Sequence, residues 1–399
     1  MAISMHYYFV RGRKIMRITI VCDVLGEANN GTSLAAYNLI NTLVNKGHDV
    51  KVICPDPEKK NLPGFYILKR LNLGFLNGYL KKNGVCLAKG DRRIIKAACK
   101  DADIVHGLVP FAASKRALKY CRKHHIPFTS GFHMQAENFT SHIFLMASNL
   151  VNKCTYSYLW STYFKKVDAI HYPTAFIRDY VKEYNKKNVP AYVISNGVNF
   201  KYFYPQKVTR PDNLKDKFVI IMSGRLSKEK NQQELLYAVK RSKYEKNIQI
   251  MLTGDGPRRN ALLKLAKRLK FTNPIMQKLY KHEELNTALW LGDLYVHTSI
   301  VEIEAISCLE AIACGLVPVI ADSKKSATRM FSLDDRCKYQ SKNINDLTAH
   351  IDYWIEHPEE KAELQEKYQI FIKKFDFEMC MDNMEKMLVE VKEKYDEKK

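Results

Sequence analysis

The stretch SIVEIEAISCLEAIACGLVPVIADS, residues 299–323, says most about how this chain folds. Its middle is rich in small residues and ends at Gly315, and Pro318 then begins a short apolar run, which is the pattern of a helix followed by a buried strand. A helix that begins near Ala305 places Glu310 one to two turns inside it and leaves Glu302 on the preceding loop. There Glu302 lies beside the free N–H groups of the first helical turn.

The two glutamates, eight positions apart, indicate a candidate ligand site. A helix N-terminus binds an anion without needing a cation, because its N–H groups and its dipole both favour negative charge. One carboxylate on each side of such an anion site suits a sugar nucleotide, with the diphosphate on the helix end and hydroxyl groups on Glu302 and Glu310. On spacing alone, the alternative is a solvated Glu302 and a Glu310 that only occupies a helix face.

Short apolar runs alternate with helical stretches on both sides of this segment, which is typical of parallel, doubly wound sheets. In the second half, the predicted strands are 218–224, 248–254, 274–280, 294–299 and 317–322. In the first half they are 16–23, 48–56, 65–70, 102–108, 127–133, 168–174 and 191–197. The predicted helices are 31–47, 88–100, 110–124, 142–164, 175–186, 231–242, 257–269, 282–291, 305–314 and 346–373.

A polar segment, residues 199–217, interrupts this alternation and is interpreted as a linker between two Rossmann-like domains. The sequence therefore predicts an α/β protein whose domains, residues 16–198 and 218–375, face each other across a cleft. The ligand is expected between the carboxyl ends of their strands. The charged tail, residues 376–399, is predicted to close the fold as one or two helices, with a C-terminal helix that crosses back to the N-terminal domain. Residues 1–15 are interpreted as an extension before the first strand.

The composition is that of a globular protein large enough for two cores, with 399 residues of which 46% are hydrophobic. Ten cysteines without a CxxC pair argue against a zinc site or a disulfide framework and fit a reduced, cytoplasmic protein. No apolar run reaches the roughly 18–20 residues that span a bilayer, and the opening residues lack the apolar core of a signal peptide.

The net charge of +22 is concentrated in the first half of the chain. Residues 1–200 hold 29 Lys and Arg against 12 Asp and Glu, whereas residues 201–399 hold 35 against 30. A basic half indicates an anionic partner, either a lipid surface or nucleic acid, and the alternative is a lysine-rich surface that only solvates the protein. Because aromatic residues do not interleave with the cations as in a nucleic-acid-binding module, nucleic acid is not predicted as a partner.

Other candidate residues follow the ends of predicted strands. The segment SGRLSKEKN (223–231) places Arg225 and Lys230 five residues apart across a turn, where two cations can neutralise a diphosphate leaving group. His133 ends a strand and can bond a sugar hydroxyl or a phosphate, and Gly31 at a helix start allows a close approach to the backbone. The alternatives are exposed loop cations, a structural histidine and an ordinary turn.

Together these segments resemble the retaining nucleotide-sugar glycosyltransferases of the large group 1 family, family four, which have the GT-B fold. The resemblance runs from about Met16 to the C-terminus. It comprises, in chain order, the Gly31 loop, His133, ISNGVNFKYFYP (194–205), SGRLSKEKN (223–231), TGDGP (253–257) and the two glutamates with EAIACGLVPVIADS. It implies a GT-B enzyme that transfers a sugar from a nucleotide donor with retention of configuration.

The resemblance also implies roles for the donor-site residues. Arg225 and Lys230 would bind the nucleotide diphosphate. Glu310 would bind the ribose hydroxyls, and Glu302 would bind the hydroxyls of the donor sugar.

Backbone groups near residues 305–307, with Ile306 and Ser307, would cradle the phosphate. His133 would lie near the donor sugar and Gly31 at the junction of donor and acceptor. The family generally needs no metal, so neither a metal ion nor another cofactor is expected.

One departure from the family lies inside the motif. The family usually follows the first glutamate with Gly-Phe-Gly, whereas Ile303, Glu304 and Ala305 stand here. Either Glu304 faces solvent or the donor pocket is reshaped, so the sequence does not identify the sugar. Lys324 and Lys325 follow the last strand of the motif and would favour an anionic group near the site.

The leading hypothesis is a hexosyltransferase that uses a UDP-sugar and a membrane-associated acceptor, such as diacylglycerol or a lipid-linked saccharide. The basic N-terminal half would bind the acceptor and dock on anionic lipid at the inner face of the plasma membrane. Helices around 72–100 and 139–165 would form the rim, with Phe139, Phe144, Leu145, Trp160 and Tyr163. Another GT-B activity, such as that of an epimerase or a phosphorylase, is the alternative enzyme class, and a basic nucleic-acid-binding protein is the non-enzymatic one.

Overall fold

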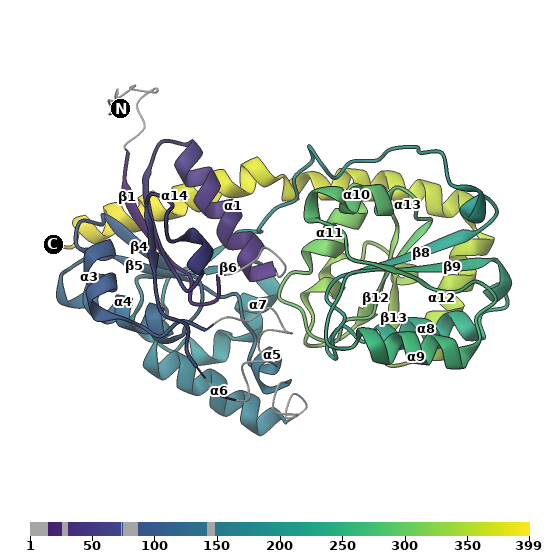
Figure 1. Cartoon of the computed structure of the whole chain (residues 1–399), viewed down its shortest axis with the longest axis horizontal. Helices are drawn as coiled ribbons and strands as arrows, with labels where there is room; N and C mark the ends of the chain where they lie inside the picture. Colours follow the sequence, from purple (N-terminus) through teal and green to yellow (C-terminus); the bar gives the residue numbers. More distant parts are fainter. Residues whose placement is uncertain (1–14, 26–30, 73, 75–86, 142–147) are drawn as a thin grey trace.

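The computed structural model describes residues 15–25, 31–72, 74, 87–141 and 148–399, without the side chains of Asn138, Phe139 and Ser141. In this part of the chain, two α/β domains lie side by side, each built on a parallel sheet with helices packed against it (Figure 1). The N-terminal domain is drawn in purple to teal and the C-terminal domain mainly in green. The predicted fold class is confirmed.

The sheet of the N-terminal domain has the order β3-β2-β1-β4-β5-β6-β7 in the described residues, and its neighbouring strands are parallel. The strands are β1 (Arg17–Val21), β2 (Asp49–Cys54), β3 (Phe65–Ile67), β4 (Ile104–Gly107), β5 (Phe128–Gly131), β6 (Ala169–Tyr172) and β7 (Ala191–Val193). The order reverses between β1 and β4. Open parallel sheets bind ligands at such a reversal, at the carboxyl ends of the strands.

The sheet of the C-terminal domain has the order β10-β9-β8-β11-β12-β13 and is also parallel throughout its described strands. The strands are β8 (Phe218–Ser223), β9 (Ile248–Thr253), β10 (Met276–Lys278), β11 (Leu294–His297), β12 (Pro318–Asp322) and β13 (Lys338–Gln340). Here the order reverses between β8 and β11. Because helices cover both faces, the central strands are buried along nearly their whole length, which their apolar sequences allow.

The α-helices of the N-terminal domain are α1 (Gly31–Asn45), α3 (Arg92–Cys99), α4 (Ala112–Lys123), α5 (Ala136–Ser141), α6 (Asn149–Thr162) and α7 (Ala175–Tyr180). The α-helices that follow in the chain are α8 (Gln232–Arg241), α9 (Arg259–Leu269), α10 (Leu285–Leu289), α11 (Ile306–Ala313), α12 (Ile344–Glu356), α13 (Pro358–Phe371) and α14 (Phe377–Asp396).

The structure differs from the predicted elements at β13, at α5, which was not predicted as a separate helix, and at Pro358. β13 was not predicted, because only one of its three residues, Tyr339, is apolar and no periodicity shows over so short a strand. The helix predicted at 346–373 is two helices, since Pro358 occupies the first turn of α13 and cannot continue α12. The predicted extension, apart from Ile15, and residues 73, 75–86 and 142–147 of the predicted rim lie outside the described residues, as does the side chain of Phe139.

The C-terminal helix belongs to the N-terminal domain. Met381, Met384 and Leu388 of α14 are buried in one core with Leu39 and Leu43 of α1. In Figure 1 the yellow α14 lies across the N-terminal domain, while α13 lies along the C-terminal domain. The chain therefore crosses between the domains twice, as predicted.

The two segments that cross between the domains are hydrogen-bonded to each other. The amide of Val198 donates to the carbonyl of Phe375 over 2.8 Å, and the amide of Phe377 donates to the carbonyl of Val198 over 3.1 Å. At Gly197, φ is +77° and an added Cβ would lie 2.8 Å from the Cα of Phe377, so the close approach requires glycine. We call residues 195–199 and 375–377 the interdomain crossing.

Candidate functional site

The candidate site lies in the C-terminal domain at the carboxyl ends of β8 and β11, where the strand order reverses. Residues 224–231 follow β8, and residues 298–305 follow β11 and lead into α11. Open parallel sheets bind their ligands at such a point.

Lys230 and Glu302 form an ion pair at this point. Glu302 is 9% exposed, and its Oε1 accepts hydrogen bonds from Lys230 Nζ and from His297 Nε2, the latter over 3.1 Å. Burial alone would raise the pKa of Glu302, but Lys230 and His297 outweigh burial and lower the pKa to about 2. Burial lowers the pKa of His297, so its ring is neutral and donates its Nε2–H to the carboxylate. Glu302 is therefore ionised at physiological pH.

The start of α11 lies beside this pair. A Cβ built on Gly224 would lie 3.8 Å from Lys230 Nζ and 4.0 Å from Ser307 Oγ, so the three residues surround one space. Ala305 precedes the helix with φ +61° and ψ +61° and provides no side-chain cap for its first N–H groups. The cation, the hydroxyl and the helix dipole together form a site suited to an anion.

Glu310 lies one turn further along α11 and is 3% exposed. His282 Nε2 donates to its Oε1 over 2.5 Å. Burial lowers the pKa of His282, but Glu310 outweighs burial and the pKa is raised. The imidazole ring also lies 5.3 Å from the ring of buried Phe203. Glu310 is thus oriented by a histidine rather than solvated.

Arg225 forms an ion pair with a glutamate on its own loop. Its guanidinium donates to Glu229 Oε1 over 2.7 Å, and Ser227 Oγ donates to the same oxygen over 2.7 Å. Burial would raise the pKa of Glu229, but Arg225 and Ser227 outweigh it and the pKa is lowered. Arg225 and Lys230 lie on the same loop, but each contacts a glutamate of its own.

Glu304 neither faces solvent nor enters the space beside Lys230. It is 4% exposed and accepts hydrogen bonds from the amide of Asn196 over 3.1 and 3.3 Å, and also from Ser195 Oγ and Asn196 Nδ2. The expectation of a solvent-facing Glu304 is wrong. Burial raises its pKa to about 7, against the lowering effect of these hydrogen bonds.

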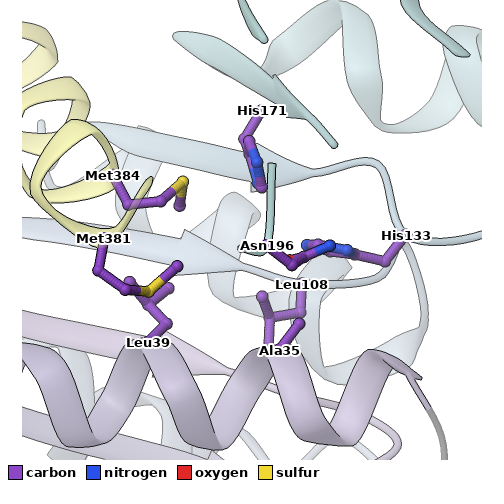
Figure 2. A pocket seen from close by; sticks show the side chains of 8 residues that line it. All are labelled: Ala35, Leu39, Leu108, His133, His171, Asn196, Met381 and Met384. Carbon is purple, nitrogen blue, oxygen red and sulfur yellow. The ribbon is translucent and has the colours of Figure 1, made fainter. Parts of the chain in front are cut away.

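His133 lies in the other domain, just after β5, and borders a small pocket. Figure 2 shows His133 and Asn196 close together, with Met381 and Met384 of α14 further along the pocket. The surrounding protein, and then the neighbouring His171 and His106, lower the pKa of His133 well below its usual value. Its ring is therefore neutral and able to donate or accept a hydrogen bond.

His171 borders the same pocket. Its Nε2 donates to the carbonyl of Ile194 over 2.7 Å, and its Nδ1 is buried without a hydrogen-bond partner among the described residues. The ring of His171 is therefore held in place by one hydrogen bond at the edge of the pocket.

The remaining candidate residues, Gly31, Lys324 and Lys325, have fewer contacts with the site. Gly31 is the exposed first residue of α1, and a Cβ added to it would meet nothing within 4 Å, so the described structure does not bring it against the other candidates. Lys324 is exposed, whereas Lys325 forms an ion pair with buried Glu137 over 3.3 Å. Gln135 also donates to the carbonyl of Lys325 over 3.0 Å, so this lysine links the two domains.

The prediction that Trp160 and Tyr163 lie at the rim is wrong. Trp160 and Tyr163 are 4% and 0% exposed and belong to the core. Sequence reasoning also missed His282, His297 and Glu229, which contact the predicted residues. Of these, Glu229 lies within the segment SGRLSKEKN and His297 within the predicted strand 294–299, whereas no motif marked His282.

The comparisons with known proteins agree with this fold. The family described as Glycosyltransferase Family 4 matches residues 29–202, and the family described as Glycosyl transferases group 1 matches residues 206–370. The chain belongs to the group 1 glycosyltransferases, with the GT-B fold, and is therefore an enzyme.

Among its relatives, an alpha-monoglucosyldiacylglycerol synthase of Acholeplasma laidlawii is 25% identical over 96% of this chain and 99% of the relative. An alpha-monoglucosyldiacylglycerol synthase of Streptococcus pneumoniae is 23% identical over 79% of this chain and 73% of the relative. Among solved structures, sucrose-phosphate synthase of Thermosynechococcus elongatus has a TM-score of 0.75 at 14% identity, over 94% of this chain and 99% of that one. Anabaena HepE in complex with UDP-glucose has a TM-score of 0.72 at 16% identity, again over 94% and 99%.

Of the helices that the structure describes, none combines the length and the apolar character needed to cross a bilayer.

Proposed function

We propose that the protein transfers a hexosyl group, with retention, from a UDP-sugar to a membrane-associated lipid acceptor such as diacylglycerol or a lipid-linked saccharide. The observation that carries the donor half is the convergence of Lys230, Ser307 and the start of α11 on one space, beside ionised Glu302. Related proteins named as glucosyldiacylglycerol synthases support the acceptor half.

In this proposal the donor diphosphate takes the space beside Gly224. Lys230 and Arg225 neutralise its charge, and the N–H groups of Ile306 and Ser307 bind its oxygens. Cations placed where negative charge grows stabilise the departing diphosphate in the transition state.

Glu310 accepts hydrogen bonds from the ribose hydroxyls, and Glu302 accepts them from hydroxyls of the donor sugar. In the reaction the bond from the anomeric carbon to the diphosphate oxygen breaks, and a bond to the acceptor oxygen forms on the same face. The acceptor proton passes to the departing diphosphate. Neutral His133 contributes a hydrogen bond near the sugar, and the proposal requires no metal ion or other cofactor.

The acceptor reaches the site from a membrane surface in this proposal. Leu150, Cys154 and Tyr158 lie four residues apart along α6, so they share one face; Leu150 is 73% and Tyr158 57% exposed. Lys115 Nζ lies 4.5 Å from the centre of the Tyr158 ring, which adds positive charge beside this apolar face. Together with the basic first half, this face suits peripheral binding to anionic lipid at the inner side of the plasma membrane.

The test is transfer of labelled glucose from UDP-glucose to diacylglycerol in vesicles that contain phosphatidylglycerol. We expect an α-linked glycolipid, identified by the anomeric coupling in its NMR spectrum. Lys230→Ala and Glu310→Ala should each lower turnover by about a hundredfold or more, whereas Lys243→Ala, at an exposed surface pair, should not. Conversion of the UDP-sugar to another sugar or to free sugar without any acceptor would favour the other GT-B enzyme classes.

Membrane binding is measured separately by co-sedimentation. Binding to anionic vesicles should weaken as salt rises, because the attraction between charges is screened. Equal binding to neutral vesicles, or no binding at low salt, would contradict the membrane part and leave the donor site untouched.

A further inference from the structure

Glu304 belongs to the donor loop, residues 302–305, and contacts the interdomain crossing. Its carboxylate binds Ser195 and Asn196, which open the first crossing segment. In the described residues it forms no ion pair with a lysine, arginine or histidine, so hydrogen-bond donors alone hold this buried carboxyl. Such a group is costly to bury, and its partners therefore restrict where it can lie.

The residues beside Glu304 are also restrained. Thr174 Oγ1, in the N-terminal domain, donates to the carbonyl of Ile303 over 2.8 Å. On the other side, Ala305 has φ +61°, a left-handed conformation that is strained for a residue with a Cβ. The donor loop thus enters α11 in a conformation that contacts with the other domain help to hold.

Asn196 extends these contacts to the acceptor side. The same residue that binds Glu304 lines the pocket beside His133 (Figure 2). A continuous series of contacts therefore joins Lys230 and Glu302, the donor loop, Glu304, Asn196 and the His133 pocket. The two halves of the site meet at this glutamate.

We propose that Glu304 is a positioning residue that couples the shape of the donor loop to the closed arrangement of the two domains. This inference rests on the donor site proposed at Lys230, Glu302 and Glu310. When Glu304 holds Ser195 and Asn196, the loop presents the start of α11 to the diphosphate while His133 lies opposite. When it does not, the domains separate and the loop relaxes.

The experiment compares Glu304→Ala with the conservative Glu304→Gln and with Ser195→Ala. Loss of the buried hydrogen bonds in Glu304→Ala should lower kcat/KM for UDP-glucose by about ten- to a hundredfold, with most of the effect in kcat. Glutamine can still accept from the Asn196 groups and should recover most of the activity. Ser195→Ala removes one partner from the other side and should lower kcat/KM by a few-fold.

The control is Glu385→Ala. Glu385 is similarly buried, at 8% exposure, but it binds Lys46 and His48 on the N-terminal domain, away from the crossing. This variant should melt at a lower temperature and keep the kcat and KM of the parent. A role for Glu304 in stability alone would give the same result in Glu304→Ala and would overturn the proposal.

Small-angle scattering supplies a readout independent of turnover. With UDP present, Glu304→Ala should keep a larger radius of gyration than the parent protein and Glu304→Gln. Equal radii of gyration in all three proteins would overturn the proposal. It would also be overturned if Glu304→Gln were as inactive as Glu304→Ala and had lost its affinity for UDP, because Glu304 would then bind the donor directly. Failure of the donor site itself is distinct, because Lys230→Ala and Glu310→Ala would then bind UDP normally.

Discussion

The ion pair of Lys230 and Glu302 allows the candidate site to be tested without any substrate. The pKa of Glu302 falls from its ordinary 4.5 to about 2 in the folded protein. A fall of about 2.5, at about 1.4 kcal/mol for each pKa unit, corresponds to about 3 kcal/mol. Because the folded-state pKa is lowered, this stabilisation is complete above pH 4.5 and is lost as the pH falls through about 2.

Lys230→Met should therefore destabilise the C-terminal domain by about 3 kcal/mol at pH 7, since it leaves a buried carboxylate with His297 as its remaining partner. Glu302→Gln removes the charge instead, and Lys230 can extend its ammonium toward water, so we expect a smaller loss. In the double variant the losses should not add, and the coupling between the two positions should be about 2–3 kcal/mol.

The assay is urea unfolding at pH 7 and at pH 3, followed by the fluorescence of Trp290 and Trp354 in the C-terminal domain. The coupling should shrink at pH 3, where the unfolded chain retains the proton on this carboxyl. Lys243→Met, which breaks an exposed pair with Glu356, is the matched control and should leave stability unchanged. Additive losses at pH 7 would refute the interaction between Lys230 and Glu302 on which the site is built.

Three further predictions follow from single contacts. Ala305→Gly should stabilise the protein by about 0.5–1 kcal/mol, because relief of the left-handed backbone exceeds the entropy cost of glycine; Ala311→Gly inside α11 should instead cost about 1 kcal/mol in the same urea assay. Glu310→Ala should weaken UDP binding in calorimetry by about tenfold or more; unchanged affinity would remove it from the site. The double variant Leu150→Ser, Tyr158→Ser should sediment less with anionic vesicles, while its glucose transfer to a soluble acceptor stays normal. Unchanged sedimentation would exclude the α6 face from membrane binding.

Most of the fold could be predicted because each strand and helix carries its own periodic pattern. β8 and β9 are continuous apolar runs, and α11 begins and ends with recognisable residues. The division at Pro358 was missed because the helical pattern continues on both sides of it. β13 was missed because three residues carry no periodicity.

The positions of the site residues could be predicted in part, and their partners could not. Lys230 and Glu302 each follow a predicted strand, and the structure shows that these strands are neighbours and that the two residues are in contact. The contact of Glu310 with His282 joins residues 28 positions apart through a short loop that has no motif. The pairing of Arg225 with Glu229 depends on side-chain orientation within one turn, which spacing does not determine.

Glu304 and Ala305 are best understood as one unit. The family pattern has glycine where Ala305 stands, and the φ of +61° found there is a conformation that glycine adopts without strain. The alanine needs restraint from its neighbours, and the glutamate before it supplies that restraint through Ser195 and Asn196. Glu304 stands where the family has an aromatic residue, and Ala305 where it has a glycine. The restraint from Glu304 thus offsets the backbone strain at Ala305, but it makes the conformation of the donor loop depend on the other domain. It follows that Ala305→Gly, combined with Glu304→Ala, should restore part of the stability that Glu304→Ala loses, but not the closed arrangement.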